Sequence, residues 1–318
     1  MYTVRPPPGH PDNNRVKNLP FADLPCGMNF VTVFAMIAGY MFMPESFALA
    51  NGSSTHHIRV PSLAFYIEHP NGKKAMFDLG MRKDTESNPP MIKRLMHETW
   101  KPTVPKDPRD YLEEARMAHE SIDYIFISHP HFDHSGDIYR FPKSQLVVGQ
   151  GTLAHVGNAW PTNPNGSYRS DSIKLTDGRN TTEIEYTDKM VGAFETTFDF
   201  FGDGSFILVD APGHCAGHML ALARISPTQY VLFGGDAAHH RDIYRQLTKP
   251  GVFDLGNGHA VSVHNDFDEA WSTILKIHRA SLESNVMVLL AHDHQLLPEG
   301  LPLFPHALNG WVIDQMNA

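Results

Sequence analysis

The sequence is poor in cysteine and in basic residues, and both shortages exclude classes of protein. Two cysteines, Cys26 and Cys215, in 318 residues allow one disulfide at most, so a disulfide-stapled secreted scaffold is excluded and a reducing compartment is favoured. The chain has 26 Lys and Arg against 35 Asp and Glu, which gives a net charge of −9. Because that charge opposes binding to a phosphate backbone, we expect no nucleic-acid partner.

Long apolar runs are also scarce. The longest, from Met28 to Met43, contains Asn29, Thr32 and Gly39 and stops at a proline. It is too short and too interrupted to cross a bilayer, and its β-branched and aromatic residues predict a buried strand. The N-terminal segment carries prolines and asparagines where a secretory signal needs a continuous apolar core. We therefore expect no membrane partner and a cytoplasmic protein.

The remaining composition, 42% hydrophobic and 19% charged, is that of a folded globular chain. Apolar runs bounded by turn residues predict strands, and helical spacing appears at 91–96 and at 267–277, with Asp266 as a possible cap of the second helix. We expect one α/β domain over residues 1–318, with an N-terminal arm at about 1–29 and a surface excursion at about 154–189 that shapes a substrate pocket. The expected strands are 30–38, 63–68, 75–78, 124–128, 145–148, 205–210, 230–233 and 286–291.

One segment concentrates groups that bind metals. The apolar residues 122–127 run directly into His129, His131, Asp133 and His134, an H-x-H-x-D-H pattern. At this histidine and aspartate content the pattern arises by chance in roughly one sequence in 200, so the signal is strong. Neutral imidazole and carboxylate are ligands of borderline divalent metals such as zinc. Alternate residues of an extended segment point the same way, so His129 and His131 can hold one ion while the next two address another.

Four ligands do not complete two metal sites, and three more candidates follow apolar strands. His214 stands in APGHCAGH, Asp236 in GGDAAHH and His292 in AHDH. Each lies at the carboxyl end of an expected strand, where α/β proteins commonly gather their sites.

Together with the DLG at 78–80, these motifs resemble the ordered motifs of the metallo-β-lactamase superfamily. The resemblance runs from about Phe30 to His294 and is strongest to the lactonase branch, which includes N-acyl homoserine lactonases: PSLAFYIEHPNGKKAMFDLG and DAPGHCAGH are similar to segments of that branch. It implies a four-layer αβ/βα sandwich with the metals at one edge between two sheets.

The resemblance also implies roles for the seven side chains. His129, His131 and His214 would hold one metal, Asp133, His134 and His292 a second, and Asp236 would bridge the two. The implied cofactors are two divalent ions per chain, with zinc the first expectation and manganese, iron or cobalt possible. A hydroxide bridging the two metals would attack the substrate carbonyl, and the second metal would stabilise the leaving group. Asp133 and Asp236, together with His239, are the residues expected to serve catalysis.

His239 departs from the lactonase pattern, in which a tyrosine commonly stands three residues after the bridging aspartate. An imidazole can replace the tyrosine as a hydrogen-bond or proton donor, or it can form the pocket wall. Two neighbours of His214 receive other interpretations. Cys215 is interpreted as packed structure, and His218 as a hydrogen-bond partner of the site rather than a ligand.

The expected function is opening of a small cyclic ester or amide, that is a lactone, a lactam or a cyclic carbamate such as a benzoxazolinone. Such a substrate fits a detoxifying lactamase as well as a quorum-quenching lactonase. Two alternatives stay open. A thioesterase of the glyoxalase II kind would need a basic C-terminal region, and the last residues contain few Lys or Arg. An iron-dependent oxidoreductase on the same fold would be either a mononuclear iron enzyme or a diiron partner of a flavoprotein, and the complete second ligand set argues against the mononuclear form.

Overall fold

The computed structural model describes residues 16–254 and 260–317. The first half of the expected N-terminal arm, 1–15, lies outside the described residues. The second half packs on the body of the protein: Ala22 pairs with Gly192, and Phe21 and Leu24 pack against buried apolar residues. Within the described ranges, no helix combines the length and the apolar character needed to span a membrane.

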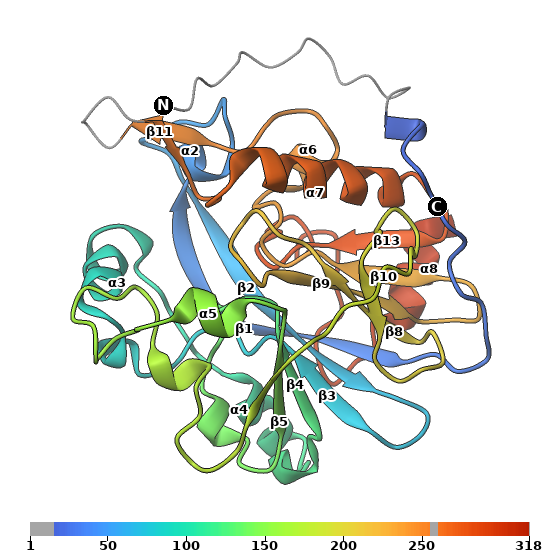
Figure 1. Ribbon diagram of the computed structural model, residues 1–318, viewed down its shortest axis with the longest axis horizontal. Helices are drawn as coiled ribbons and strands as arrows, with labels where there is room; N and C mark the ends of the chain where they lie inside the picture. Colours follow the sequence, from blue (N-terminus) through green and yellow to red (C-terminus); the bar gives the residue numbers. More distant parts are fainter. Residues whose placement is uncertain (1–15, 255–259, 318) are drawn as a thin grey trace.

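Two sheets form the centre of the molecule (Figure 1). Sheet 1 has the order β1-β2-β3-β4-β5-β6 and sheet 2 the order β13-β10-β9-β8-β7. The strands of sheet 1 are β1 (Thr32–Pro44), β2 (His57–Glu68), β3 (Lys74–Phe77), β4 (Tyr124–Ile127), β5 (Gln145–Val148) and β6 (Thr181–Glu183). Those of sheet 2 are β7 (Thr197–Asp199), β8 (Phe206–Asp210), β9 (Met219–Arg224), β10 (Tyr230–Phe233) and β13 (Val286–Leu289). A separate hairpin pairs β11 (Val252–Asp254) with β12 (Ala260–Ser262).

Alternation along the strands explains why the sheets are covered on both faces. In β8, Phe206 and Leu208 join the apolar core between the sheets, whereas Ile207 and Val209 join a second core on the outer face of sheet 2. Successive side chains of a strand point to opposite faces, so a continuous apolar run requires cover on both sides. Sheet 1 follows the same rule. Phe77 joins the core between the sheets, whereas Met76, the residue before it in β3, joins the core on the outer face of sheet 1.

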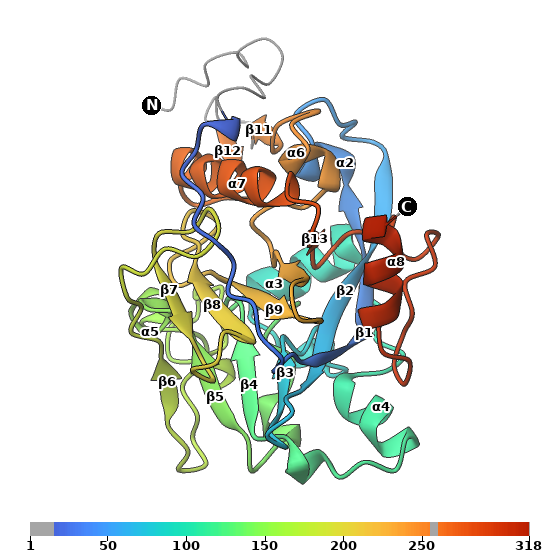
Figure 2. The same cartoon turned by 90° about the vertical axis from the view of Figure 1, so that its right-hand side faces the viewer.

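Helices supply the outer layers (Figure 2). The helix α7 (Phe267–Ser281) covers the outer face of sheet 2 with Ile274 and Ile277, and the Asp266 carboxylate caps it by accepting from the Glu269 amide at 3.0 Å. The outer face of sheet 1 packs against α4 (Pro108–Glu114). The other helices are α2 (Glu45–Ala48), α3 (Pro90–Leu95), which continues as a π-helical turn (Met96–Trp100), α5 (Thr152–Val156), α6 (Arg241–Tyr244) and α8 (Asn309–Asn317). The expected four-layer αβ/βα arrangement is confirmed.

The expected strands all occur, but their bounds and number differ. The first continues past Ala38 to Pro44 through an irregularity between Ile37 and Tyr40, because the glycine between them bends the strand without ending it. The sequence did not predict β9, whose alanines and leucines carry little strand preference and whose six residues are all buried. The segment expected as an excursion, 154–189, contributes β6 to the edge of sheet 1.

Candidate metal centre

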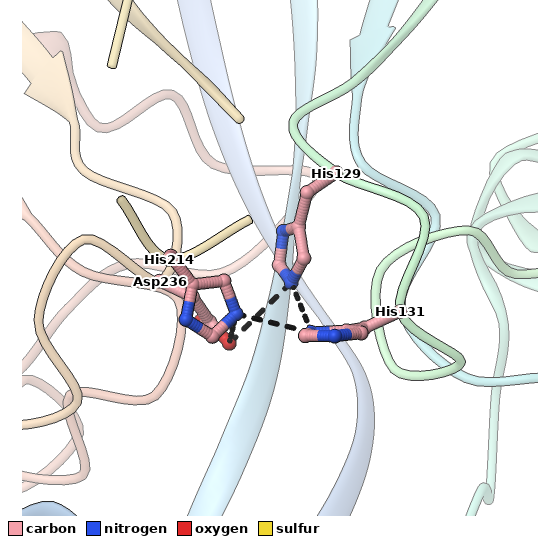
Figure 3. A group of neighbouring side chains, drawn as sticks. All are labelled: His129, His131, His214 and Asp236. Atoms are coloured by element: carbon pink, nitrogen blue, oxygen red, sulfur yellow. Dashed lines mark hydrogen bonds and ion pairs between the residues drawn. The ribbon is translucent and has the colours of Figure 1, made fainter. Parts of the chain in front are cut away.

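All seven predicted ligands meet at one edge of the two sheets. The groups of side chains that could hold an ion are His129, His131, His214 and Asp236 in one set, and Asp133, His134 and His292 in the other, with the possible ligand atoms of each set within 4.8 Å of one another. Figure 3 shows the first set, with three imidazoles and a carboxylate pointing toward one another. These residues follow β4 in sheet 1 and β8, β10 and β13 in sheet 2.

The directions of the strands in sheet 2 explain why the ligands that follow them lie close together. β8 and β10 are each antiparallel to β9, so they run the same way, and β13 is parallel to β10. Their carboxyl ends therefore lie at a common edge, and the loops after them carry His214, Asp236 and His292 to one place. Gly213 permits one of these loops to approach α7: its φ is +118°, and a Cβ there would lie 2.1 Å from the Ala270 nitrogen.

Asp236 faces both sets. Its Oδ2 lies 3.6 Å from Nε2 of His129 and 3.6 Å from Nε2 of His214. Its other oxygen, Oδ1, lies 3.2 Å from Nε2 of His134 and 3.2 Å from Nε2 of His292. One carboxylate with an oxygen toward each set is the geometry that a bridging ligand requires.

The hydrogen bonds of the second set show what it fits. Nδ1 of His134 donates to the Asp78 carboxylate at 2.8 Å, and Nδ1 of His292 donates to the Pro61 carbonyl at 2.8 Å. In a neutral ring the opposite nitrogen then presents a lone pair. Both lone pairs face Oδ1 of Asp236, which is buried without a hydrogen-bond partner among the described residues. Buried acceptors that face one another need a cation between them, and this donor set suits a divalent metal.

Burial and the neighbouring carboxylates shift the pKa values of these imidazoles in opposite directions. Burial lowers the pKa of His129 and His214 well below the usual value and that of His131 to about 4. Burial also lowers the pKa of His292, but the nearby Asp236 and Asp133 carboxylates outweigh it and raise the pKa to about 10. Burial thus dominates the pKa values in the first set, whereas the carboxylates dominate that of His292 in the second.

Asp78 and Ser128 hold the loop after β4 in place. The Asp78 carboxylate accepts from the amide and the hydroxyl of Ser128, at 2.7 and 2.8 Å, in addition to His134. Asp78 adopts φ +60°, a left-handed conformation uncommon for a non-glycine residue. The backbone is thus constrained where it orients a candidate ligand.

His218 has no free ring nitrogen to offer a metal. Its Nδ1 donates to the Ala211 carbonyl at 3.0 Å and its Nε2 accepts from the Asp236 amide at 3.1 Å. Both nitrogens are engaged with backbone, so the residue ties the loop after β8 to the loop after β10. Cys215 is free and buried, and burial raises the pKa of its thiol.

His239 and one unpredicted histidine lie beside the cluster. Nε2 of His239 is 3.2 Å from Oδ2 of Asp236, and the side chain is buried. His264, buried in the segment after β12, places Nδ1 3.2 Å from Nδ1 of His214. The sequence analysis gave His264 no role, because a single histidine in AVSVHND carries no motif, and only the fold brings it to the site.

The chain was then compared with known proteins. The family model described as metallo-beta-lactamase superfamily matches residues 57–292. The metallo-hydrolase mfmC of Annulohypoxylon moriforme is 33% identical over 81% of this chain and 76% of its own length. The gamma-lactamase FDB1 of Fusarium pseudograminearum is 32% identical over 83% of this chain and 73% of its own.

Solved structures show the same fold. A crystal structure of B. thuringiensis AiiA with N-decanoyl-L-homoserine bound at the active site has a TM-score of 0.69 and 16% identity, covering 88% of this chain and 100% of that one. AidC, described as a dizinc quorum-quenching lactonase, has a TM-score of 0.52 and 14% identity, covering 86% of this chain and 92% of its own. The family model and the two sequence relatives, each matched over more than two thirds of its own length, confirm the resemblance to the metallo-β-lactamase superfamily. The chain is a hydrolase and belongs to the metallo-β-lactamase superfamily.

Proposed function

We propose that this protein opens a small cyclic ester or amide, with two divalent ions held by the seven clustered residues. The observation that carries the proposal is the position of Asp236, whose two oxygens face the two ligand sets separately. His129, His131 and His214 would hold one ion and Asp133, His134 and His292 the other. The naming of FDB1 as a gamma-lactamase and of AidC as a quorum-quenching lactonase supports a ring-opening substrate.

Two such ions, when bound, activate water at neutral pH and polarise a carbonyl. We propose zinc, because nitrogen and carboxylate ligands suit it. The chain itself excludes bulk water: six of the seven side chains are buried, and His131 alone is partly exposed. The substrate therefore reaches the site beside His131.

His239 is proposed to assist the leaving group. Its Nε2 lies against the Asp236 carboxylate, while Nδ1 is buried without a hydrogen-bond partner among the described residues. A ring held by one nitrogen can exchange a proton or hydrogen bond with the departing oxygen or nitrogen through the other. Replacing His239 by Ala is expected to lower kcat at unchanged metal content. Unchanged kinetics would identify His239 as pocket wall.

The deciding experiment is a hydrolysis screen of the metal-loaded protein, with metal content measured on the same sample. Acyl-homoserine lactones, aromatic lactones, benzoxazolinones, β-lactams and glutathione thioesters cover the open classes. We expect close to two ions per chain, turnover of a lactone or lactam, and loss of turnover on chelation that returns with zinc. Turnover of the thioester alone, or a single tightly bound iron, would contradict the proposal.

We propose detoxification of a small ring compound as the biological setting of this activity. Cys26 and Cys215 are both free, which is consistent with the cytoplasmic location that we propose.

A further inference from the structure

His264 lies beside the metal centre, in the segment between β12 and α7. Its side chain is 5% exposed, and its Nδ1 lies 3.2 Å from Nδ1 of His214, with the two rings nearly perpendicular at an interplanar angle of 82°. Within the described ranges this is the one hydrogen bond of the His264 ring, since Nε2 has no partner there. Burying an imidazole is costly where an apolar side chain could fill the same space, so packing alone does not account for this residue.

The backbone next to His264 is fixed to the loop that carries His214. The Asn265 amide donates to the His214 carbonyl at 3.0 Å, and the Asp266 amide donates to the Gly213 carbonyl at 2.9 Å. These two bonds join segments that lie 50 residues apart in the chain. Because successive residues make them, the His264 ring keeps a defined position relative to the His214 ring.

The other ligand histidines show what a partner at Nδ1 does. Four of the five candidate ligand histidines face the Asp236 carboxylate through Nε2, and three of these four donate from Nδ1 to an oxygen. The three pairs are His134 with the Asp78 carboxylate at 2.8 Å, His292 with the Pro61 carbonyl at 2.8 Å and His129 with the Ser128 hydroxyl at 3.1 Å. An acceptor at Nδ1 keeps the proton on that nitrogen and leaves the lone pair of Nε2 for a metal.

His214 is the fourth of these rings, and His264 stands where the other three have an oxygen. Nε2 of His214 lies 3.0 Å from Nδ1 of His131 and 3.6 Å from Oδ2 of Asp236, so it faces the other members of its set. For Nε2 to offer a lone pair, the proton of the neutral ring must be on Nδ1, and Nδ1 of His264 is within reach to accept it. The other tautomer would point a proton toward His131 and Asp236, where a metal needs a lone pair.

We propose that His264 is a positioning residue of the metal centre: it accepts the Nδ1 proton of His214 and so fixes the tautomer and the ring orientation with which His214 holds an ion. It acts through His214 and not on the substrate. The inference rests on the metal centre of the proposed function, but not on which ring compound is opened.

The test measures Co²⁺ binding to His264→Leu and His264→Asn by competition with a chromogenic chelator. Leucine fills the space but accepts no hydrogen bond, whereas the side-chain oxygen of asparagine can take the place of Nδ1. We expect His264→Leu to weaken the binding of one of the two ions by about 10- to 100-fold, and His264→Asn to restore most of that loss. The matched control is His278→Leu in α7, since His278 is also 5% exposed, and it should leave both affinities unchanged.

Proton NMR of the Co²⁺-loaded protein supplies a readout that a merely structural role would not move. The ring N–H of a histidine bound to Co²⁺ gives a strongly shifted signal, and a hydrogen bond to that N–H slows its exchange with D₂O. One such signal, protected in wild type and in His264→Asn, should exchange faster in His264→Leu.

Equal Co²⁺ affinity in wild type and His264→Leu would overturn the proposal, and so would an equal loss in the leucine and asparagine variants, which would make His264 a packing residue. If His264→Leu does not fold, His264→Asn decides: retention of the affinity and of the protected signal supports the proposal, and loss of either overturns it. A wild-type protein that binds two Co²⁺ ions but opens no ring compound would contradict the proposed function alone. A wild-type protein that binds no ion would contradict both.

Discussion

The two sheets contribute to the metal centre in different ways. Sheet 1 supplies four of its side chains from one short loop, 129–134, directly after β4. Sheet 2 supplies three from separate loops, placing His214, Asp236 and His292 after β8, β10 and β13. The first half is thus a local motif that the chain carries wherever β4 ends. The second half exists only when three strands run in the same direction and finish at one edge.

The contacts that hold the loop of sheet 1 in place also differ from those that hold the loops of sheet 2. The loop of sheet 1 is braced by the Asp78 carboxylate, which accepts from Ser128 and His134, and by the Leu79 amide, which donates to the His134 carbonyl. The loops of sheet 2 are tied to each other: Arg241 after β10 forms a buried pair with Asp293 after β13, at 2.7 Å. The residues of the local motif are thus held by the neighbouring loop after β3, whereas the loops of sheet 2 are held by contacts with one another.

Asp236→Ala removes the one side chain that faces both halves, and we expect the largest effect from it. Hydrolysis should fall to background and metal content should drop from about two ions per chain, measured by elemental analysis. Asp236→Asn, similar in size, should also fail because the amide presents only one acceptor oxygen. Full activity in either variant would contradict a shared ligand. Asp123→Asn, a surface position before β4, serves as the control.

Arg241→Met tests the tie within the sheet 2 half. Arg241 and Asp293 are 4% and 3% exposed, and breaking a buried ion pair from one side costs about 3–5 kcal/mol. The free energy of unfolding in urea should fall by that order. Adding Asp293→Asn should recover part of the loss, because it removes the unpaired buried charge. A single variant as stable as wild type would show that the loops are held by other contacts.

Asp78→Asn tests the brace of the sheet 1 half. An asparagine amide replaces one of the two accepting oxygens by a donor, so either Nδ1 of His134 or the Ser128 amide loses its acceptor and the loop that orients His134 is disturbed. Metal affinity should weaken by about 10- to 100-fold, as found for comparable outer partners of metal ligands. Asparagine tolerates the left-handed backbone of this position. Competition with a chromogenic chelator measures the change, and an unchanged affinity would exclude Asp78 as the brace.

Asp266→Ala should have the smallest effect. The residue caps α7, and its amide donates to the Gly213 carbonyl at 2.9 Å beside His214. Loss of a cap costs about 1 kcal/mol, while the backbone bond to the His214 loop is kept. We expect a small decrease in the urea midpoint and near-normal metal content, with Asp266→Asn restoring stability. A large metal loss would mean that the cap itself positions His214.

Prediction from the sequence succeeded where the information is local. The strand before His129, the spacing of the four residues after it and the cap of α7 could all be derived from neighbouring residues. It failed for β9, because a short run of alanine and leucine in a fully buried strand has no alternation to detect. It also assigned no role to His264, which lies far along the chain from His214, the residue that it contacts.

The sequence by itself indicated an α/β domain with seven candidate metal ligands, because ligand type and spacing are properties of short segments. The family resemblance supplied the hydrolytic function and the expected division of the seven residues between two metals. Only the tertiary structure decided that each oxygen of Asp236 faces a different set and that His239 and His264 border the cluster. These facts depend on where strands end relative to one another, which the packing of two sheets determines.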